Sequence, residues 1–230
     1  MTLVGRGANL TRMFPCIKPF VSPLQCSLAL LALTVLPLRA QTAVTEKDIE
    51  VSNVHFNMVP PPAGSTTKTG WCQVDVEVNV KPGAATQATH SFLNRVKVTL
   101  SLAFHDPTEK DALKFSYYRA SAEVVALEVG RSNLRFYLPG EIIKRDSLAG
   151  EAKYYAVELA VGGKAIPMKK GNGYSEASLP DLEHVQNFLT KAGAESAAND
   201  GSLLPQYLTG YANDNSRPSP TIVRPEAVGK

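Results

Sequence analysis

Apolar and polar side chains alternate along most of the chain after residue 48. The clearest run is WCQVDVEVNV, residues 71–80, in which valines and a cysteine alternate with polar or charged side chains. Residues 96–104, VKVTLSLAF, follow nearly the same rule. Successive side chains of a strand lie on opposite faces of its sheet. Both runs therefore predict strands with one buried face and one face in water.

The first strand is predicted over residues 49–58, with an irregularity inside it. The alternation shifts by one position at Ser52-Asn53, which is typical of a β-bulge. The following residues 59–64, VPPPAG, cannot continue a ladder because proline has no N–H to donate. They predict a connection between two strands.

Further strands are expected where turn signals interrupt the remaining apolar runs. They cover residues 115–117, 123–129, 134–138, 142–143 and 154–161. The chain would then have about seven or eight short strands, with a turn about every ten residues and no helix-length crossover between them. This spacing favours a mainly β fold, an antiparallel β-sandwich.

One helix is predicted in the C-terminal part of the chain. The apolar side chains from Leu182 to Ala192 fall on one helical face. Pro180 lies near the first turn, and Asp181 lies at the positive end of the helix. The motif Asn199-Asp200-Gly201 is a stop signal, and the residues after 210 have no periodicity.

The first forty residues have the features of an export signal. A basic lead-in precedes the apolar run LALLALTVL at residues 28–36, which is too short to span a membrane, and Ala40 ends an acceptable cleavage site. Removal of residues 1–40 takes away four of the 24 basic residues and none of the 21 acidic ones, so the net charge becomes 24 − 4 − 21 = −1. This charge and the absence of a basic stripe argue against nucleic acid as a partner.

The chain therefore divides into four predicted parts. They are a signal peptide at residues 1–40, a β-sandwich domain at 41–178, a helix with a C-terminal extension on or near the sandwich at 179–210, and a flexible tail at 211–230. We expect the protein to be exported to the periplasm, the outer surface or the medium, with no transmembrane anchor after signal cleavage.

Catalytic, metal and cofactor sites are not expected. Cys72 is the one cysteine left after the signal, so it has no disulfide partner, and it points inward on a strand. The four histidines, at positions 55, 90, 105 and 184, are too far apart for a metal-ligand motif. The chain has no nucleophile elbow, phosphate loop or dinucleotide fingerprint. We predict that it is not an enzyme.

The stretch FYLPGEIIKRD, residues 136–146, has two interpretations. Pro139 and Gly140 break the strand, which is expected to resume at Ile142-Ile143. The break forms either a structural corner of the sheet or an exposed edge that binds a partner by strand addition. In the second case the binding residues would be Phe136, Tyr137, Pro139 and Gly140.

Several phrases of the sequence resemble the small secreted pilus-associated proteins of Verrucomicrobia. They are FYLPGEIIKRD at 136–146, YYAVELAVGGK at 154–164, the helix that contains Phe188-Leu189, and NDGSLLPQYL at 199–208. The resemblance implies an immunoglobulin-like sandwich that is encoded among type IV pilus-like assembly genes and has no known catalytic residues. The chain lacks the Gly-Phe cleavage site and long apolar helix of a major pilin, so the resemblance implies an accessory role.

Three hypotheses for function follow. The first is an exported, non-enzymatic interaction protein whose partners are envelope or pilus-assembly proteins. The second is a periplasmic or surface sandwich that binds carbohydrate or protein through exposed aromatic side chains. The candidates for that surface are Tyr117, Tyr118, Phe136, Tyr137 and Tyr174. The third is a hydrolase whose pair of carboxylates comes together only in the folded protein.

Overall fold

The computed structural model describes residues 48–83, 86, 91–105, 114–148, 150–168 and 172–224. All of them belong to one compact unit, Ala40–Lys230. The predicted signal peptide lies outside the described residues. Among the residues that are described, no helix has the length and hydropathy needed to cross a membrane.

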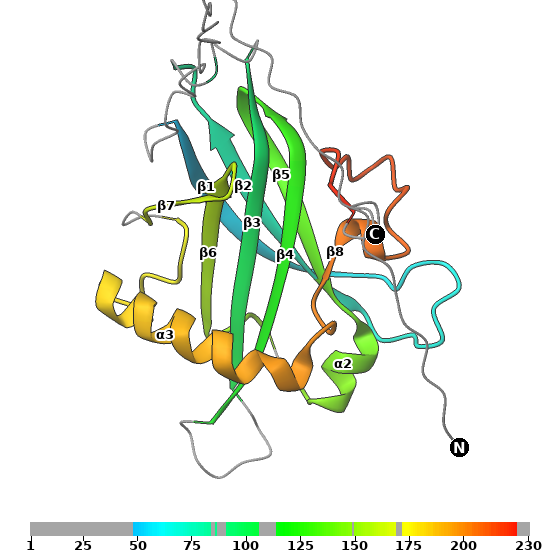
Figure 1. Ribbon diagram of the computed structural model, residues 1–230. Coiled ribbons are helices and arrows are strands. Elements are labelled where there is room, and N and C mark those ends of the chain that lie inside the picture. The colour runs from blue at the N-terminus through cyan, green and yellow to red at the C-terminus, as the bar shows by residue number, and fades with distance from the viewer. Residues whose placement is uncertain are drawn as a thin grey trace, which may run out of the picture. The chain divides into compact units, whose positions relative to one another are not determined.

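The described chain forms two antiparallel four-stranded sheets packed face to face (Figure 1). In order, the first sheet consists of β1 (Ile49–Val59), β2 (Trp71–Val80), β5 (Gly130–Leu138) and β8 (Leu204–Pro205). The second consists of β4 (Phe115–Glu128), β3 (Phe92–His105), β6 (Tyr154–Val161) and β7 (Lys164–Ile166). The predicted antiparallel β-sandwich is confirmed.

The partition of strands between the sheets is that of an immunoglobulin-like fold. The first, second and fifth strands share one sheet, and the third, sixth and seventh share the other, as strands A, B and E and strands C, F and G do in that fold. The fourth strand extends the second sheet beside β3. Alternate side chains of both sheets therefore meet in a single core.

The core consists of the apolar side chains that the alternation places inward. Val74, Val76 and Val78 of β2 are fully buried, as is Leu100 of β3. Cys72 lies in the same row and is a free, buried thiol, as predicted. Burial, with a smaller contribution from the charge of Glu151, raises the pKa of this thiol to about 11, so it stays protonated at neutral pH and packs as an apolar group.

The predicted helix is α3 (Leu182–Glu195), which lies across the outer face of the second sheet (Figure 1). The carboxylate of Asp181 caps its first turn by accepting a hydrogen bond from the backbone N–H of His184. Phe188 and Ala192 are buried against Tyr117 and other side chains of that sheet. The amphipathic pattern thus covers a sheet face that would otherwise be exposed to water.

Three local predictions have clear outcomes. The bulge is confirmed, because the β1–β2 register shifts between Val51 and Asn53. The strands predicted at 115–117 and 123–129 are one continuous strand, β4. The strand predicted to resume at Ile142-Ile143 is wrong, because residues Gly140–Arg145 form a short helix, α2.

Helix α2 has a simple local cause. Pro139, with φ −59°, stands at its N-cap and needs no donor there, Glu141 lies in the first turn, and Lys144 and Arg145 lie in the last. Both charge placements suit the helix dipole. The two isoleucines pack against the core at the end of the sandwich. The strand therefore ends at a structural corner, which was the first of the two interpretations.

The tail beyond residue 210 also differs from expectation. Tyr211 is buried, and Ile222 forms an isolated bridge with Val124 of β4. Residues 211–224 thus pack on the sandwich, so for them the prediction of a flexible tail is wrong. The short 3-10 helices Ser196–Asn199 and Gln206–Leu208 lead the chain from α3 toward this position.

Candidate functional site: the two edges of the first sheet

The binding edge predicted from FYLPGEIIKRD is closed. Phe136 and Tyr137 are fully buried and pair with Pro205 and Leu204 of β8. Gly140 is also buried, against Thr69, and its neighbour Pro139 stands at the N-cap of α2. An exposed partner-binding edge at these residues is therefore wrong. No pattern in residues 136–146 predicts that residues 204–205 pair with the end of β5 and cover it.

The segment that follows β8, residues 206–224, is here called the C-terminal cover. Its central side chain is Tyr211, whose ring stacks on Tyr137 with centroids 4.6 Å apart and meets Trp71 edge-on at 5.8 Å. The Tyr211 hydroxyl donates a hydrogen bond to the carbonyl of Pro60. Because aromatic pairs contribute about 0.5–1.5 kcal/mol beyond their buried area, this cluster holds the cover on the sheet.

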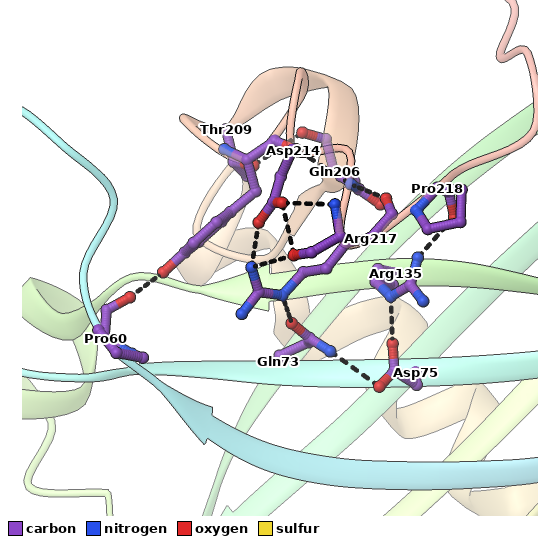
Figure 2. Close-up of polar contacts among 11 residues, drawn as sticks. Pro60, Gln73, Asp75, Arg135, Gln206, Thr209, Asp214, Arg217 and Pro218 are labelled. Atoms are coloured by element: carbon purple, nitrogen blue, oxygen red, sulfur yellow. Dashed lines mark hydrogen bonds and ion pairs between the residues drawn. The ribbon is translucent and has the colours of Figure 1, made fainter.

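Arg217 connects the cover to the polar side chains on the outer face of β2 (Figure 2). Its guanidinium lies over the ring of Tyr211, 5.3 Å from the centroid, and pairs with Asp214. Its Nε donates to Oε1 of Gln73 at 3.0 Å. One arginine thus makes a cation–π contact, an ion pair and a hydrogen bond at one place.

A mostly buried ion pair lies beneath the cover. Arg135 of β5 and Asp75 of β2 are 2.7 Å apart, and their side chains are only 11% and 18% exposed. Gln73 donates to the same aspartate at 2.8 Å, and Arg135 donates to the carbonyl of Pro218 at 2.6 Å (Figure 2). Removing the cover would break this last hydrogen bond and expose the pair to water.

The buried side chain of Gln206 holds the turns of the C-terminal cover together by hydrogen bonds to its backbone. Its side chain is 1% exposed, and its amide donates to the carbonyls of Tyr211 at 3.0 Å and Arg217 at 2.8 Å. The hydroxyl of Thr209 donates to the carbonyl of Gln206 at 2.7 Å. A buried glutamine with backbone partners has no signature in the sequence, so sequence analysis missed it.

The cover also reaches the edge of the second sheet. The N–H of Val125 donates to the carbonyl of Thr221 at 2.9 Å, and the N–H of Val223 donates to the carbonyl of Glu123 at 2.6 Å. The C-terminal cover therefore closes parts of two edge strands, β5 in one sheet and β4 in the other.

The opposite edge of the first sheet, strand β1, is open. Among the described residues β1 pairs only with β2. The side chain of Asn172 donates to the carbonyl of Ser52, at the bulge. We call the unpaired side of residues 53–59 the β1 edge.

Beyond the bulge at Val51–Asn53, the β1 edge has neither of two devices that usually protect an edge strand, charged side chains and proline. Residues 51–59, VSNVHFNMV, contain no Asp, Glu, Lys, Arg or Pro. The outer strands of the second sheet carry charge, for example Arg119 and Glu123 in β4 and Lys164 in β7. The other outer strand of the first sheet, β8, is only two residues long and ends in a proline. An uncharged edge strand with free backbone donors and acceptors is a template for pairing with another strand.

The two faces of the β1 edge differ. His55 and Asn57 are exposed on the outer face, next to the polar side chains of β2. On the inner face Val54 is buried, Phe56 is half-buried against Tyr155, and Met58 is 61% exposed at the end of the sandwich. The edge thus offers backbone groups and an apolar side chain together.

The surface for the carbohydrate hypothesis is not formed by the aromatic residues expected to make it. Their exposed fractions are 5% for Tyr117, 0% for Tyr118, Phe136 and Tyr137, and 1% for Tyr174. A stacking surface for sugar needs exposed rings. These five residues instead stabilise the core and the contacts of α3 and the cover.

Asp146 is the most strongly engaged carboxylate near the closed edge. It accepts hydrogen bonds from the Tyr118 hydroxyl at 2.5 Å and from Arg145 at 2.6 Å. These bonds, the one from Arg145 first, lower the pKa of Asp146. The arrangement fixes the end of α2 to β4. Within the described residues there is no cluster of three or more His, Cys, Asp or Glu side chains that would hold a metal ion.

Comparison with solved structures finds proteins of similar fold. No protein-family model and no curated protein matches the chain. A crystal structure of a protein from Akkermansia muciniphila is similar, with a TM-score of 0.52 and 15% sequence identity, over 77% of this chain and 93% of that one. At this identity the likeness shows the fold alone.

Proposed function

We propose that the chain is an exported, non-enzymatic structural protein, an accessory component of a type IV pilus-like or other cell-surface assembly. The observation that carries the proposal is the β1 edge, an uncharged strand without a strand neighbour on its outer side among the described residues. Such an edge recognises an extended strand through main-chain hydrogen bonds, and side-chain pockets add specificity.

The phrases that resemble the pilus-associated proteins of Verrucomicrobia support the surface assembly. They include residues 136–146 and 199–208, which form the end of β5 with α2 and the approach to the cover. The similar fold of a protein from Akkermansia muciniphila is compatible with this role. The export features of residues 1–40 support partners in the envelope.

The first test asks whether the chain is exported. The natural host is fractionated, and the intact mass of the protein is measured in each fraction. We expect the protein outside the cytoplasm, with a mass that corresponds to a start at Gln41. A full-length chain confined to the cytoplasm would overturn the proposal.

The second test identifies the partners. Tagged chain from Gln41 to Lys230 is used as bait for solubilised envelope of the natural host, and the retained proteins are identified by mass spectrometry. We expect pilus-assembly or other envelope proteins, and an exported β-sandwich domain of unrelated sequence serves as the control bait. Equal recovery of those proteins with both baits contradicts the proposal.

A further inference from the structure

The β1 edge has two natural ends. At one end the carbonyl of Ser52 accepts a hydrogen bond from Asn172, next to the bulge between Val51 and Asn53. At the other end Pro60 follows the strand and cannot donate to a ladder. Between these ends lie residues 53–59, with Phe56 at their midpoint. The N–H of Val54 donates to the side-chain oxygen of Asn53 at 2.9 Å, so a pairing strand must displace that side chain.

This stretch is compatible with pairing to a second copy of itself. If two copies run antiparallel about a two-fold axis at Phe56, residue 53 lies opposite residue 59, and the obstructed Ser52 lies opposite Pro60, where the other strand has ended. The limits of the two strands therefore coincide in this register. A two-fold interface requires such self-complementarity.

The side chains match in the same register. On the inner face Phe56 meets Phe56 of the second copy, and the exposed Met58 meets Val54. On the outer face His55 meets Asn57. Within residues 54–58, apolar side chains thus face apolar ones and polar face polar; the end pair, Asn53 opposite Val59, is the mixed one. No two like charges meet, because residues 51–59 have none.

We infer that the β1 edge binds the β1 edge of a second copy and joins the two first sheets into one continuous antiparallel sheet. The inference rests on the proposed structural role and names the partner of that edge. Seven residues on each side form a small contact, so the dimer is expected to be weak and dependent on concentration.

The test compares three variants of the chain from Gln41 to Lys230 by sedimentation equilibrium over a wide range of concentration. The variant His55→Lys/Asn57→Lys places lysine opposite lysine on both sides of the axis. The control, Gln186→Lys/Asn187→Lys, adds the same charge on the exposed face of α3. We expect the first to weaken dimerisation by about tenfold or more and the control to leave it unchanged.

The third variant makes the test specific for register. In His55→Lys/Asn57→Glu, each new lysine lies opposite the glutamate of the second copy, so the dimer should recover to at least the wild-type level. If the strands instead paired about residue 55, the lysines would face each other and the dimer would be lost. Amide exchange at residues 53–59, measured at low and high concentration, should show protection that increases with dimerisation.

The outcomes separate this inference from the proposed function. A wild-type chain that stays monomeric at every concentration overturns the inference, and so does a dimer that the double lysine variant leaves intact. Capture of an envelope protein that is lost with the double lysine variant, by a bait that is monomeric, would mean that another protein's strand occupies the edge. In that case the inference fails and the proposed function stands.

Discussion

The β5 and β1 sides of the first sheet both have main-chain donors and acceptors that could pair with another strand, but only the β5 side is covered by the chain itself. On the β5 side, β8 pairs with Phe136 and Tyr137, and the C-terminal cover lies over the adjoining outer face. On the β1 side no strand of the described residues covers the edge; only the side chains of Asn172 and Asn53 bond its backbone, at Ser52 and Val54. Exposed main-chain groups of an edge strand bind other strands unless they are blocked. The difference is the reason that we propose the intermolecular contact at β1, while the contacts on the β5 side stabilise the chain itself.

The side chains at each edge are consistent with a covered β5 side and an uncovered β1 side. The β5 side buries tyrosines and an ion pair, Arg135–Asp75, that only a covering segment can keep from water. The β1 edge has an imidazole and an amide, His55 and Asn57, on its outer face; such uncharged polar side chains can be solvated by water or lie beside another strand. On the inner face Met58 is exposed, so apolar contact is available at that end of the edge.

The largest predicted effect comes from breaking the closed side at Tyr211. Tyr211→Ala removes a ring that is stacked on Tyr137 and packed on Trp71, so the free energy of unfolding should fall by about 3 kcal/mol. Urea denaturation followed by tryptophan fluorescence measures it, because Trp71 is the one tryptophan. Tyr211→Phe keeps the ring and loses only the hydrogen bond to Pro60, for which we expect about 1 kcal/mol. A loss below that value for the alanine variant would mean that the cover does not stabilise the sheet.

A smaller loss is expected at the corner that ends β5. In Gly140→Ala the new methyl group would overlap the backbone carbonyl of Thr69, so the chain must shift, at a cost of about 2 kcal/mol. Gly150→Ala is not a suitable control because that glycine has a positive φ of 69°. Gly193→Ala in α3 is the matched control, because its added methyl group would meet only the Arg119 guanidinium, at 3.5 Å. Thermal unfolding should separate Gly140→Ala from the wild type, and unchanged melting would refute the close approach.

The next effect depends on pH and concerns Asp146, which ties α2 to β4 beside the closed edge. Because its folded pKa is lowered by Arg145 and Tyr118, its stabilisation is present above the unfolded value of about 3.9 and is lost as the pH falls through the folded pKa. Asp146→Asn should therefore cost about 1 kcal/mol at neutral pH. The difference from wild type should shrink below about pH 4. Denaturation curves across this range test it, and a constant difference would contradict the assignment.

The smallest effect on stability is predicted for the open edge. His55→Lys/Asn57→Lys changes two exposed side chains, so the free energy of unfolding of the monomer should change by no more than about 0.5 kcal/mol. The measurement is made at a concentration where the wild type is monomeric. A loss comparable to that of Tyr211→Ala would show that the β1 edge supports the fold itself, and the contrast between the two edges would disappear.

Much of the fold could be predicted because its cause is local. The alternation in β2 and β3, the phase shift at Ser52-Asn53 and the apolar face of α3 each appear in a few consecutive residues. The burial of Cys72 follows from the same alternation. Two misjudged segments, residues 142–143 and 115–129, have short or interrupted patterns in which periodicity is weak.

The candidate site could not be predicted in the same way. The sequence alone determined the long strands, the helix α3 and the inward faces of β2 and β3, because side-chain periodicity and capping act within one element. Only the tertiary structure decided that Tyr211 returns to stack on Tyr137, 74 positions earlier in the numbering of the chain, and that β1 is left without a second neighbour. Pairing between distant segments depends on where the chain leads after each turn, and that path is set by packing of the whole sandwich, which no single stretch of residues encodes.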